Sequence, residues 1–305
     1  PSDVAVPAAM AAAVRAYEER TGARDTVAVV VVQGTERNIM DQRVLEHALW
    51  ETHRVRVRRV TLAALATEAR LDGAGRTLRL RGEGGRGDDG VALVYFRAGY
   101  APTDFVTEAD WEARELVERS AAIKCPNLAY HLCGTKKVQQ VLSAPGVVER
   151  FATSPSDAAA LRACFAGLWT LDASEGDVGG GAAAAVADAR ARPAGYVVKP
   201  QREGGGNNLY GDAVAAALHP DTGMPPATRA AHILMERIFP APAPTLLVKA
   251  GAATLASAVS ELGIYSTFLG DGVVSLLDGP AGHLLRTKAV EVDEGGVAAG
   301  YAVDD

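Results

Sequence analysis

The sequence has 305 residues, of which 48% are hydrophobic, and its formal net charge is -6. A chain of this length can bury a large core and is expected to form two domains. Its negative charge argues against nonspecific nucleic-acid binding, and no stretch approaches the roughly 20 apolar residues of a membrane-spanning helix.

The three cysteines, Cys125, Cys133 and Cys164, lack the Cys-x-x-Cys spacing of zinc and redox sites. Free thiols in a reducing cytoplasm are therefore expected. The chain begins at Pro1 rather than Met and shows no signal segment, which is compatible with a fragment of a longer protein.

Residues 8–20 have the pattern of a helix that ends at Gly22, and the apolar, β-branched run 27–32 predicts a buried strand. Further patterns predict helices over 41–53 and 61–71 and a strand over 91–96. Apolar and charged or polar residues alternate, as in a strand, over 55–60 and 77–81. Strands that alternate with helices indicate an α/β fold with a parallel or mixed sheet for residues 25–134.

Polar residues follow two of these strands, at 36–42 and 97–100. Ligands of open α/β sheets bind beyond the carboxyl ends of the strands, so both segments are candidates for ligand contacts. Solvated loops are the alternative interpretation.

Thr107 and Asp110 resemble a capping box that opens a helix through residue 123. A helix predicted over 134–142 begins with Lys136 and Lys137, and two cations at a helix start are more reasonable beside a bound anion. A helix over 154–169 and a connector with a helix inside it, over 171–195, are expected next.

Residues 196–211 combine a strand, Lys199 at its end, Pro200, Glu203 and three consecutive glycines. Glycines let backbone N–H groups approach phosphate oxygens closely, so this stretch predicts a lid over a metal-bound polyphosphate. It lacks the patterns of a P-loop and of a dinucleotide fold. A flexible surface loop is the alternative.

The remaining patterns are a helix over 212–219 and strands over 233–238, 246–249, 255–268, 273–277 and 283–290. Arg286 and Lys288 would share one face of the last strand.

Several motifs together resemble the eukaryotic-type glutathione synthetases, which are ATP-grasp ligases. They are Glu36-Arg37-Asn38-Ile39, Tyr95-Phe96-Arg97 with Gly99-Tyr100, Gly134 to Gln140, Lys199 to Gly211, Ser260 to Ile264, Gly282 to Lys288, and Gly295 to Gly300. The resemblance implies an N-terminal helix (1–24), an α/β substrate-binding domain (25–134) and an ATP-grasp domain with a Gly-rich lid (135–305).

The resemblance also implies the activity: ATP-dependent ligation of γ-glutamylcysteine to glycine through an acyl phosphate, with Mg²⁺. Arg286, Lys199 and Glu203 would be catalytic, with Glu203 a Mg²⁺ ligand. Nucleotide contacts would come from Lys136, Lys199, Gly204, Gly205, Asn208, Tyr210, Met235, Glu236, Arg237, Ile238, Glu261, Lys288 and Glu294. Substrate contacts would come from Glu36, Arg37, Asn38, Gln42, Arg97, Ala98, Gly99, Tyr100, Arg286, Val297 and Ala298.

The sequence departs from the family pattern at Ala98, where Asp is usual, at Arg237, where Lys is usual, and at Glu294, where Asp is frequent. An N-terminal segment with further Mg²⁺ and substrate ligands is also expected in the family. A cytoplasmic homodimer is implied, with no nucleic-acid or membrane partner. The alternatives are a ligase for another amine, such as β-alanine, and a noncatalytic ATP-binding fragment.

Overall fold

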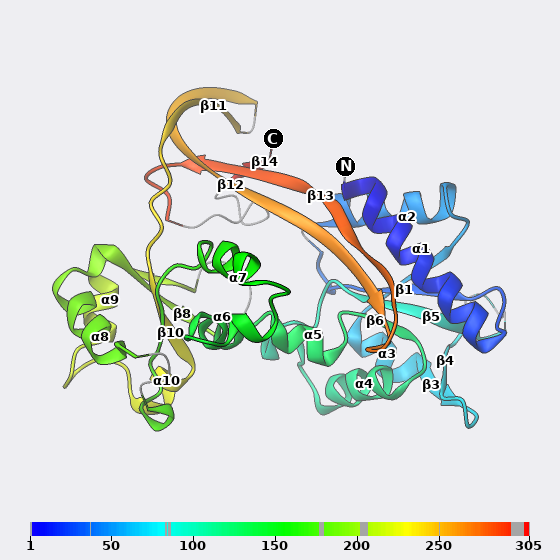
Figure 1. Ribbon diagram of the computed structural model, residues 1–305. Coiled ribbons are helices and arrows are strands. Elements are labelled where there is room, and N and C mark those ends of the chain that lie inside the picture. The colour runs from blue at the N-terminus through cyan, green and yellow to red at the C-terminus, as the bar shows by residue number, and fades with distance from the viewer. Residues whose placement is uncertain are drawn as a thin grey trace. The chain divides into compact units, whose positions relative to one another are not determined.

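The computed structural model describes residues 2–36, 38–82, 84, 87–176, 180–201, 207–249, 251–293 and 302–304 (Figure 1). The chain divides into two compact units. The first unit comprises Pro1–Ala129, Glu261–Arg286 and Asp304–Asp305, and the second comprises Tyr130–Ser260 and Thr287–Val303. The predicted domain limits, at residues 24 and 134, stay predictions, because a domain is defined by its ability to fold on its own.

A mixed sheet forms the centre of the first unit, in the strand order β2-β1-β5-β4-β3, with β6 beside β5. The parallel strands are β1 (Val27–Val31), β2 (Arg56–Val60), β5 (Asp89–Phe96) and β6 (Ile123–Cys125), and the antiparallel ones are β3 (Ala69–Asp72) and β4 (Thr77–Leu80). Every residue of β1 is buried, because its apolar run is covered on both faces. The predicted α/β class with a mixed sheet is therefore confirmed.

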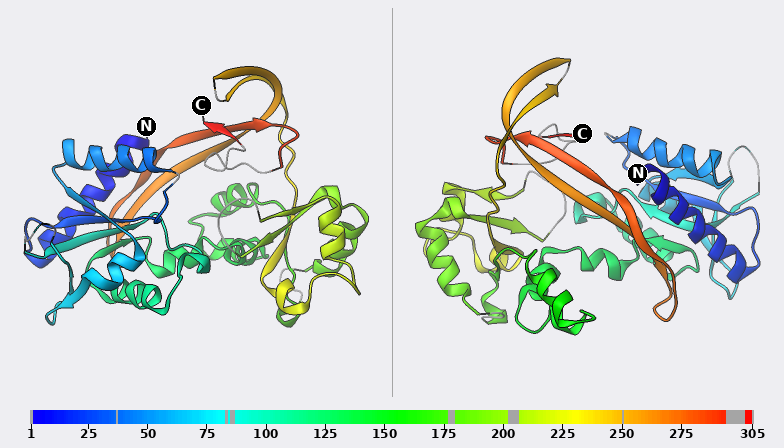
Figure 2. Two further views of the ribbon diagram at one scale, coloured as in Figure 1. Left: turned by 180° about the vertical axis from the view of Figure 1, so that it is seen from behind. Right: turned by 45° about the horizontal axis from the view of Figure 1, so that its top comes forward.

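Helices cover both faces of this sheet (Figures 1 and 2). Tyr17 and Leu49 belong to the core on the face that carries α1 and α2, and Leu65 and Val117 belong to the core on the face that carries α3 and α4. These helices are α1 (Ser2–Thr21), α2 (Ile39–Glu51), α3 (Leu62–Glu68) and α4 (Glu108–Arg119), and α5 (Leu128–Cys133) follows β6 in the chain.

The start of α4 is held by the carboxylate of Asp110. This buried group accepts hydrogen bonds from the N–H of Thr107 at 2.8 Å and from its hydroxyl at 3.0 Å. We expect Asp110→Ala to lower the free energy of unfolding by about 1 kcal/mol, because a capping interaction is lost and its donors are left unpaired. Chemical denaturation measures the change. Glu112→Ala, at an exposed position of the same helix, is the control, and equal losses in both variants would contradict the prediction.

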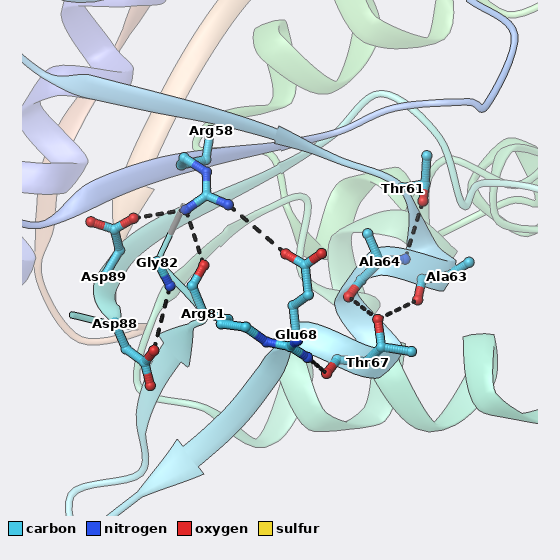
Figure 3. Close-up of polar contacts among 10 residues, drawn as sticks. All are labelled: Arg58, Thr61, Ala63, Ala64, Thr67, Glu68, Arg81, Gly82, Asp88 and Asp89. Atoms are coloured by element: carbon cyan, nitrogen blue, oxygen red, sulfur yellow. Dashed lines mark hydrogen bonds and ion pairs between the residues drawn. The ribbon is translucent and has the colours of Figure 1, made fainter. Parts of the chain in front are cut away.

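Arg58 ties β2 to its neighbours through a polar network (Figure 3). Its Nη1 donates to Asp89 Oδ2 at 2.8 Å and to the carbonyl of Arg81 at 3.3 Å, and its Nη2 lies 3.9 Å from Glu68 Oε2. Asp89 begins β5, at the end opposite to Phe96. The network therefore stabilises the fold away from the carboxyl ends of the parallel strands.

An antiparallel sheet in the order β7-β10-β8-β9 forms the centre of the second unit. Its strands are β7 (Leu168–Thr170), β8 (Tyr196–Pro200), β9 (Leu209–Tyr210) and β10 (His232–Glu236). The buried side chains of Val198, Val214 and Leu234 meet in its core, together with residues of α8. The helices are α6 (Lys136–Ser143), α7 (Pro155–Arg162), α8 (Ala182–Ala191), α9 (Asp212–Ala217) and α10 (Pro226–Ala230).

Several predicted helices end earlier than expected. The helix predicted through residue 123 ends at Arg119, and the helix predicted over 212–219 ends at Ala217. Two others are cut short by strand pairing. The helix predicted over 61–71 ends at Glu68, because β3 follows it and pairs with β4. The helix predicted over 154–169 ends at Arg162, and Trp169 lies in β7, which pairs with β10. In both cases pairing with another strand overrides the local helical pattern.

A further sheet has the order β11-β12-β13-β14. Its strands are β11 (Ala243–Lys249), β12 (Ala252–Gly270), β13 (Ser275–Ala289) and β14 (Val303–Asp304). β13 unites the two strands predicted over 273–277 and 283–290. The sequence pattern breaks at Gly279 and Pro280, whereas the strand continues because it is paired with β12.

The three cysteines are free and exposed. Every helix in the described part of the chain is too short or too polar to cross a lipid bilayer. The described residues also contain no group of three His, Cys, Asp or Glu side chains placed to hold a metal ion.

Candidate active site

The carboxyl ends of β1, β2 and β5 lie together in the first unit. Val31, the last residue of β1, pairs with Val60 of β2 and with Phe96 of β5. The N–H of Arg97 also donates to the carbonyl of Val31 at 2.8 Å. The segments that follow β1 and β5 therefore begin at one edge of the sheet, where ligands of such folds bind.

Glu36 and Gln42 form one part of this edge. Glu36 Oε1 accepts the N–H of Asn38 at 2.9 Å, and the buried Gln42 accepts from Arg59 Nη2 at 2.8 Å. Burial raises the pKa of Glu36, but hydrogen bonds, the largest from the Gln42 side chain, hold that pKa below its usual value. Glu36 is therefore ionised at neutral pH and can accept a ligand ammonium group.

Arg97 forms the cationic part of this edge. Its Nη1 donates to the hydroxyl of Tyr95 at 3.2 Å, and its Nη2 donates to Asp41 Oδ2 at 2.8 Å. Burial lowers the pKa of Arg97, but the charge and hydrogen bonds of these two neighbours raise it above its usual value. Arg97 thus stays charged and is held in one orientation, with a quarter of its side chain exposed (25%).

The loop after Arg97 is shaped by Asp104. Its Oδ2 accepts the N–H groups of Gly99 at 2.9 Å and Tyr100 at 3.1 Å. Gly99 has a φ of 81°, a conformation that glycine adopts without strain. Ala98 is buried and Tyr100 is exposed, so of these two predicted substrate contacts only Tyr100 presents its side chain to solvent.

In the second unit, α6 begins beside the end of β8. Gln201 Oε1 accepts the N–H of Lys137 at 2.7 Å, although the two residues are 64 positions apart. Thr135, the N-cap residue, gives α6 no side-chain hydrogen bond, so Gln201 supplies the acceptor instead. The end of β8 that carries Lys199 thereby adjoins the first turn of α6.

The two lysines of α6 differ in their environments. Lys137 forms an ion pair with Glu175 and donates to Gln140 Oε1 at 2.9 Å. Lys136 donates to Gln139 Oε1 at 3.2 Å and has no carboxylate within ion-pair distance among the described residues. The charge of Lys137 is therefore neutralised within the protein, whereas Lys136 can serve an anionic ligand.

Four of the predicted nucleotide contacts, Met235 to Ile238, lie at and just beyond the end of β10. The N–H of Glu236 donates to the carbonyl of Gly167 at 2.8 Å, and its Oε2 accepts the N–H of Gly167 at 3.1 Å. The N–H of Arg237 donates to the carbonyl of Gly195 at 2.8 Å. Met235 is half-buried and Ile238 is exposed, so this short segment is fixed by its backbone while it presents apolar atoms.

Asn208 and Tyr210 stand on the other side of β8 in the sheet. Tyr210 pairs with Val197 of β8, and Asn208 Nδ2 donates to the Tyr210 hydroxyl at 3.3 Å. β8 and its neighbours β9 and β10 therefore carry predicted nucleotide contacts from three sequence segments.

The long strands β12 and β13 carry the remaining candidates. Arg286 and Glu261 form an ion pair within the first unit. Lys288, which belongs to the second unit, donates from Nζ to the carbonyl of Asp293 at 2.6 Å. Arg286 and Lys288 are two positions apart on one strand, so they share a face of it.

Several predicted site residues lie outside the described part of the chain: Arg37, Glu203, Gly204, Gly205, Glu294, Val297 and Ala298. Their assigned roles stay predictions from the resemblance.

Sequence reasoning assigned no role to the residues that hold the candidate side chains in place. Asp41 falls inside the polar stretch after β1, and Asp104 lies two residues after Pro102, where turn residues are frequent, so both carried a local signal. Gln201 lies within the stretch 196–211, but neither its contact with α6 nor that of Arg59 with Gln42 had a local signal, because these contacts join distant segments.

Comparison with known proteins identifies the family. Residues 2–305 match the profile described as "Eukaryotic glutathione synthase, ATP binding domain". The chain is 46% identical to "Glutathione synthetase, chloroplastic" of Solanum lycopersicum over 305 residues, which is 100% of this chain and 53% of that protein. It is 43% identical to "Glutathione synthetase" of Homo sapiens over 290 residues, or 94% of this chain and 58% of that protein. The chain thus spans little more than half the length of these curated relatives.

A solved structure supports the fold. The glutathione synthetase-like effector of Globodera pallida superposes with a TM-score of 0.67 at 23% identity, covering 97% of this chain and 60% of that one. The resemblance seen in the sequence is confirmed by the profile match over nearly the whole chain: the protein belongs to the eukaryotic glutathione synthase family, of which it contains the ATP-binding domain.

Proposed function

We propose that the protein carrying this chain joins γ-glutamylcysteine to glycine in an ATP-dependent ligation that yields glutathione. The observation that carries the proposal is the hydrogen bond from the Lys137 N–H to Gln201, which joins the lysine-rich start of α6 to the strand that carries Lys199. Lys136 and Lys199, which lie on these two segments, are cations of the kind that bind the phosphates of ATP. The family match supports the same assignment.

The reaction proceeds in two steps. The cysteinyl carboxylate of the peptide attacks the γ-phosphorus of ATP, ADP leaves, and an acyl phosphate forms. The amine of glycine then attacks the acyl carbon, phosphate leaves, and a proton is lost from the nitrogen. Positioning and charge neutralisation suffice for such a phosphoryl transfer, so no protein nucleophile is needed.

The residues divide into two groups. Lys136 and Lys199 neutralise the phosphates, and Tyr210 contacts the nucleotide together with Asn208, Met235, Glu236, Arg237, Ile238, Glu261 and Lys288. Glu36 and Arg97 hold the charged groups of the γ-glutamyl peptide, assisted by Asn38, Gln42 and the loop at Gly99 and Tyr100. Arg286 is assigned to a substrate carboxylate by the resemblance, and its guanidinium would have to exchange its ion pair with Glu261 for that carboxylate.

One assay tests the ligation. ADP release is followed with ATP and γ-glutamylcysteine while glycine, β-alanine and serine are compared as acceptors. Faster release with glycine than with the other amines is the expected result. Equal release with all three would contradict the proposed acceptor, and ATP binding without any release would favour a noncatalytic module.

Magnesium belongs to the proposal through Glu203. Glu203 lies outside the described residues, and these contain no group of three His, Cys, Asp or Glu side chains placed to hold a metal ion. Mg²⁺ is expected to raise the affinity for ATP, and we expect this rise to be about tenfold smaller in Glu203→Gln, because one charged oxygen ligand is lost. Calorimetric titrations with ATP in the presence of Mg²⁺ and of EDTA measure the rise. An unchanged rise would remove Glu203 from the metal site.

We also propose a cytoplasmic homodimer. Two of the relatives carry "chloroplastic" in their names, so a chloroplast is the alternative to the cytoplasm. Light scattering coupled to size-exclusion chromatography tests the dimer, and a monomer mass would refute it.

A further inference from the structure

The side chain of Arg237 contacts two other segments of the second unit and one aromatic ring of its own segment. Its guanidinium carbon lies 5.3 Å from the ring centroid of Tyr210 in β9 and 5.2 Å from that of Phe239. Its Nη2 donates to Asp293 Oδ1 at 2.6 Å. One cation is thus shared by two aromatic rings and a carboxylate, and only about a quarter of the side chain is exposed (26%).

These contacts depend on the shape of the arginine side chain. A planar guanidinium can lie against an aromatic ring and still direct N–H groups at a carboxylate in its own plane. A lysine ammonium is compact and strongly hydrated, so it would keep the ion pair more easily than the two ring contacts. An isolated ion pair at this exposure contributes little, whereas three contacts on one group hold it in a single orientation.

The same contacts reach two other candidate residues. Tyr210 is joined to Asn208 through its hydroxyl at 3.3 Å. The backbone carbonyl of Asp293 accepts from Lys288 Nζ at 2.6 Å. Arg237 therefore connects the end of β10 with β9 and, through Asp293, with the lysine near the end of β13.

We propose that Arg237 is a positioning residue for the nucleotide, which sets the ring of Tyr210 and, through Asp293, the ammonium of Lys288. This inference rests on the proposed function, because it assumes that ATP binds among these residues. The guanidinium of Arg237 and the carboxylate of Asp293 act as a pair in this positioning.

The test measures ATP affinity and thermal stability in parallel, using the full chain. We expect the Kd for ATP to rise about tenfold in Arg237→Met and about threefold in both Arg237→Lys and Asp293→Ala. In Arg237→Met/Asp293→Ala the rise should stay near tenfold, because both changes break one interaction. The Tm of each variant without ATP should fall by less than about 4 °C.

Arg192→Met is the matched control, because Arg192 forms an exposed ion pair with Asp188 in the same unit and has no place in the site. Its ATP affinity should equal that of the unaltered protein. Unchanged ATP affinity in Arg237→Lys and Asp293→Ala, or fully multiplicative effects in the double variant, would overturn the inference while leaving the proposed function intact. An unaltered protein that binds no ATP would overturn both.

Discussion

Lys199→Met is expected to weaken ATP binding by about 10- to 100-fold, which is the effect of losing a charged hydrogen bond to a phosphate. Lys199 directly follows the buried residues Val197 and Val198 of β8 and pairs with Ile233 of β10, so its backbone position is fixed by the sheet. Methionine keeps the length and apolar stem of the side chain and removes its charge. Isothermal titration with ATP measures the loss, and Lys199→Arg should recover part of it.

Lys124→Met is the control for loss of one positive charge. Lys124 lies in β6 of the first unit, where its Nζ donates to the carbonyl of Ser120 at 2.6 Å, and it has no place in the site. ATP should bind this variant as it binds the unaltered protein. The assignment of Lys199 would fail if its replacement left ATP affinity unchanged, or if Lys124→Met weakened binding to the same extent.

Arg97→Met is expected to raise the Kd for γ-glutamylcysteine by about 10- to 100-fold while ATP affinity without the peptide stays constant. Arg97 lies beyond the carboxyl end of β5, where Asp41 and Tyr95 orient its guanidinium. Its raised pKa keeps it charged throughout the neutral range. Removing it takes away the cation and leaves Asp41 as an unpaired negative charge that repels an anionic peptide.

Arg119→Met provides the comparison, because Arg119 is an exposed arginine on α4 whose ion pair with Glu115 stays within the helix. Its peptide affinity should not change. The opposite pattern, in which Arg97→Met weakens ATP rather than peptide binding, would exchange the roles proposed for the two units. Together, the Lys199 and Arg97 variants show whether the two ligands have separate binding residues.

Much of the fold was predictable because its signals are local. The run of β-branched residues at Val27–Val31 can only be buried on both faces, and the structure places it in the middle of the first sheet. Helix α4 begins directly after Thr107, as the spacing of Thr107 and Asp110 predicts. The strand at Tyr196 and the polar residues that follow it were likewise read from neighbouring residues.

The predictions of secondary structure are wrong where strands that are distant in the sequence pair. Trp169 continues a helical pattern, yet it lies in β7 because β10 offers it an antiparallel partner more than 60 residues further along the chain. Gly279 and Pro280 interrupt a pattern in the sequence, yet β13 continues past them beside β12. A single sequence does not show which strand lies next to which.

Motif order and local periodicity are properties of the chain alone, so they suffice to predict the family, the α/β class and the candidate residues. How those residues are held depends on contacts that form only on folding. Gln201 caps the helix of Lys136 across 64 positions, and Arg237 lies against Tyr210 and Asp293. Such contacts join segments that have no fixed spacing in the sequence. These segments come together because strands pair and apolar side chains are buried in a common core.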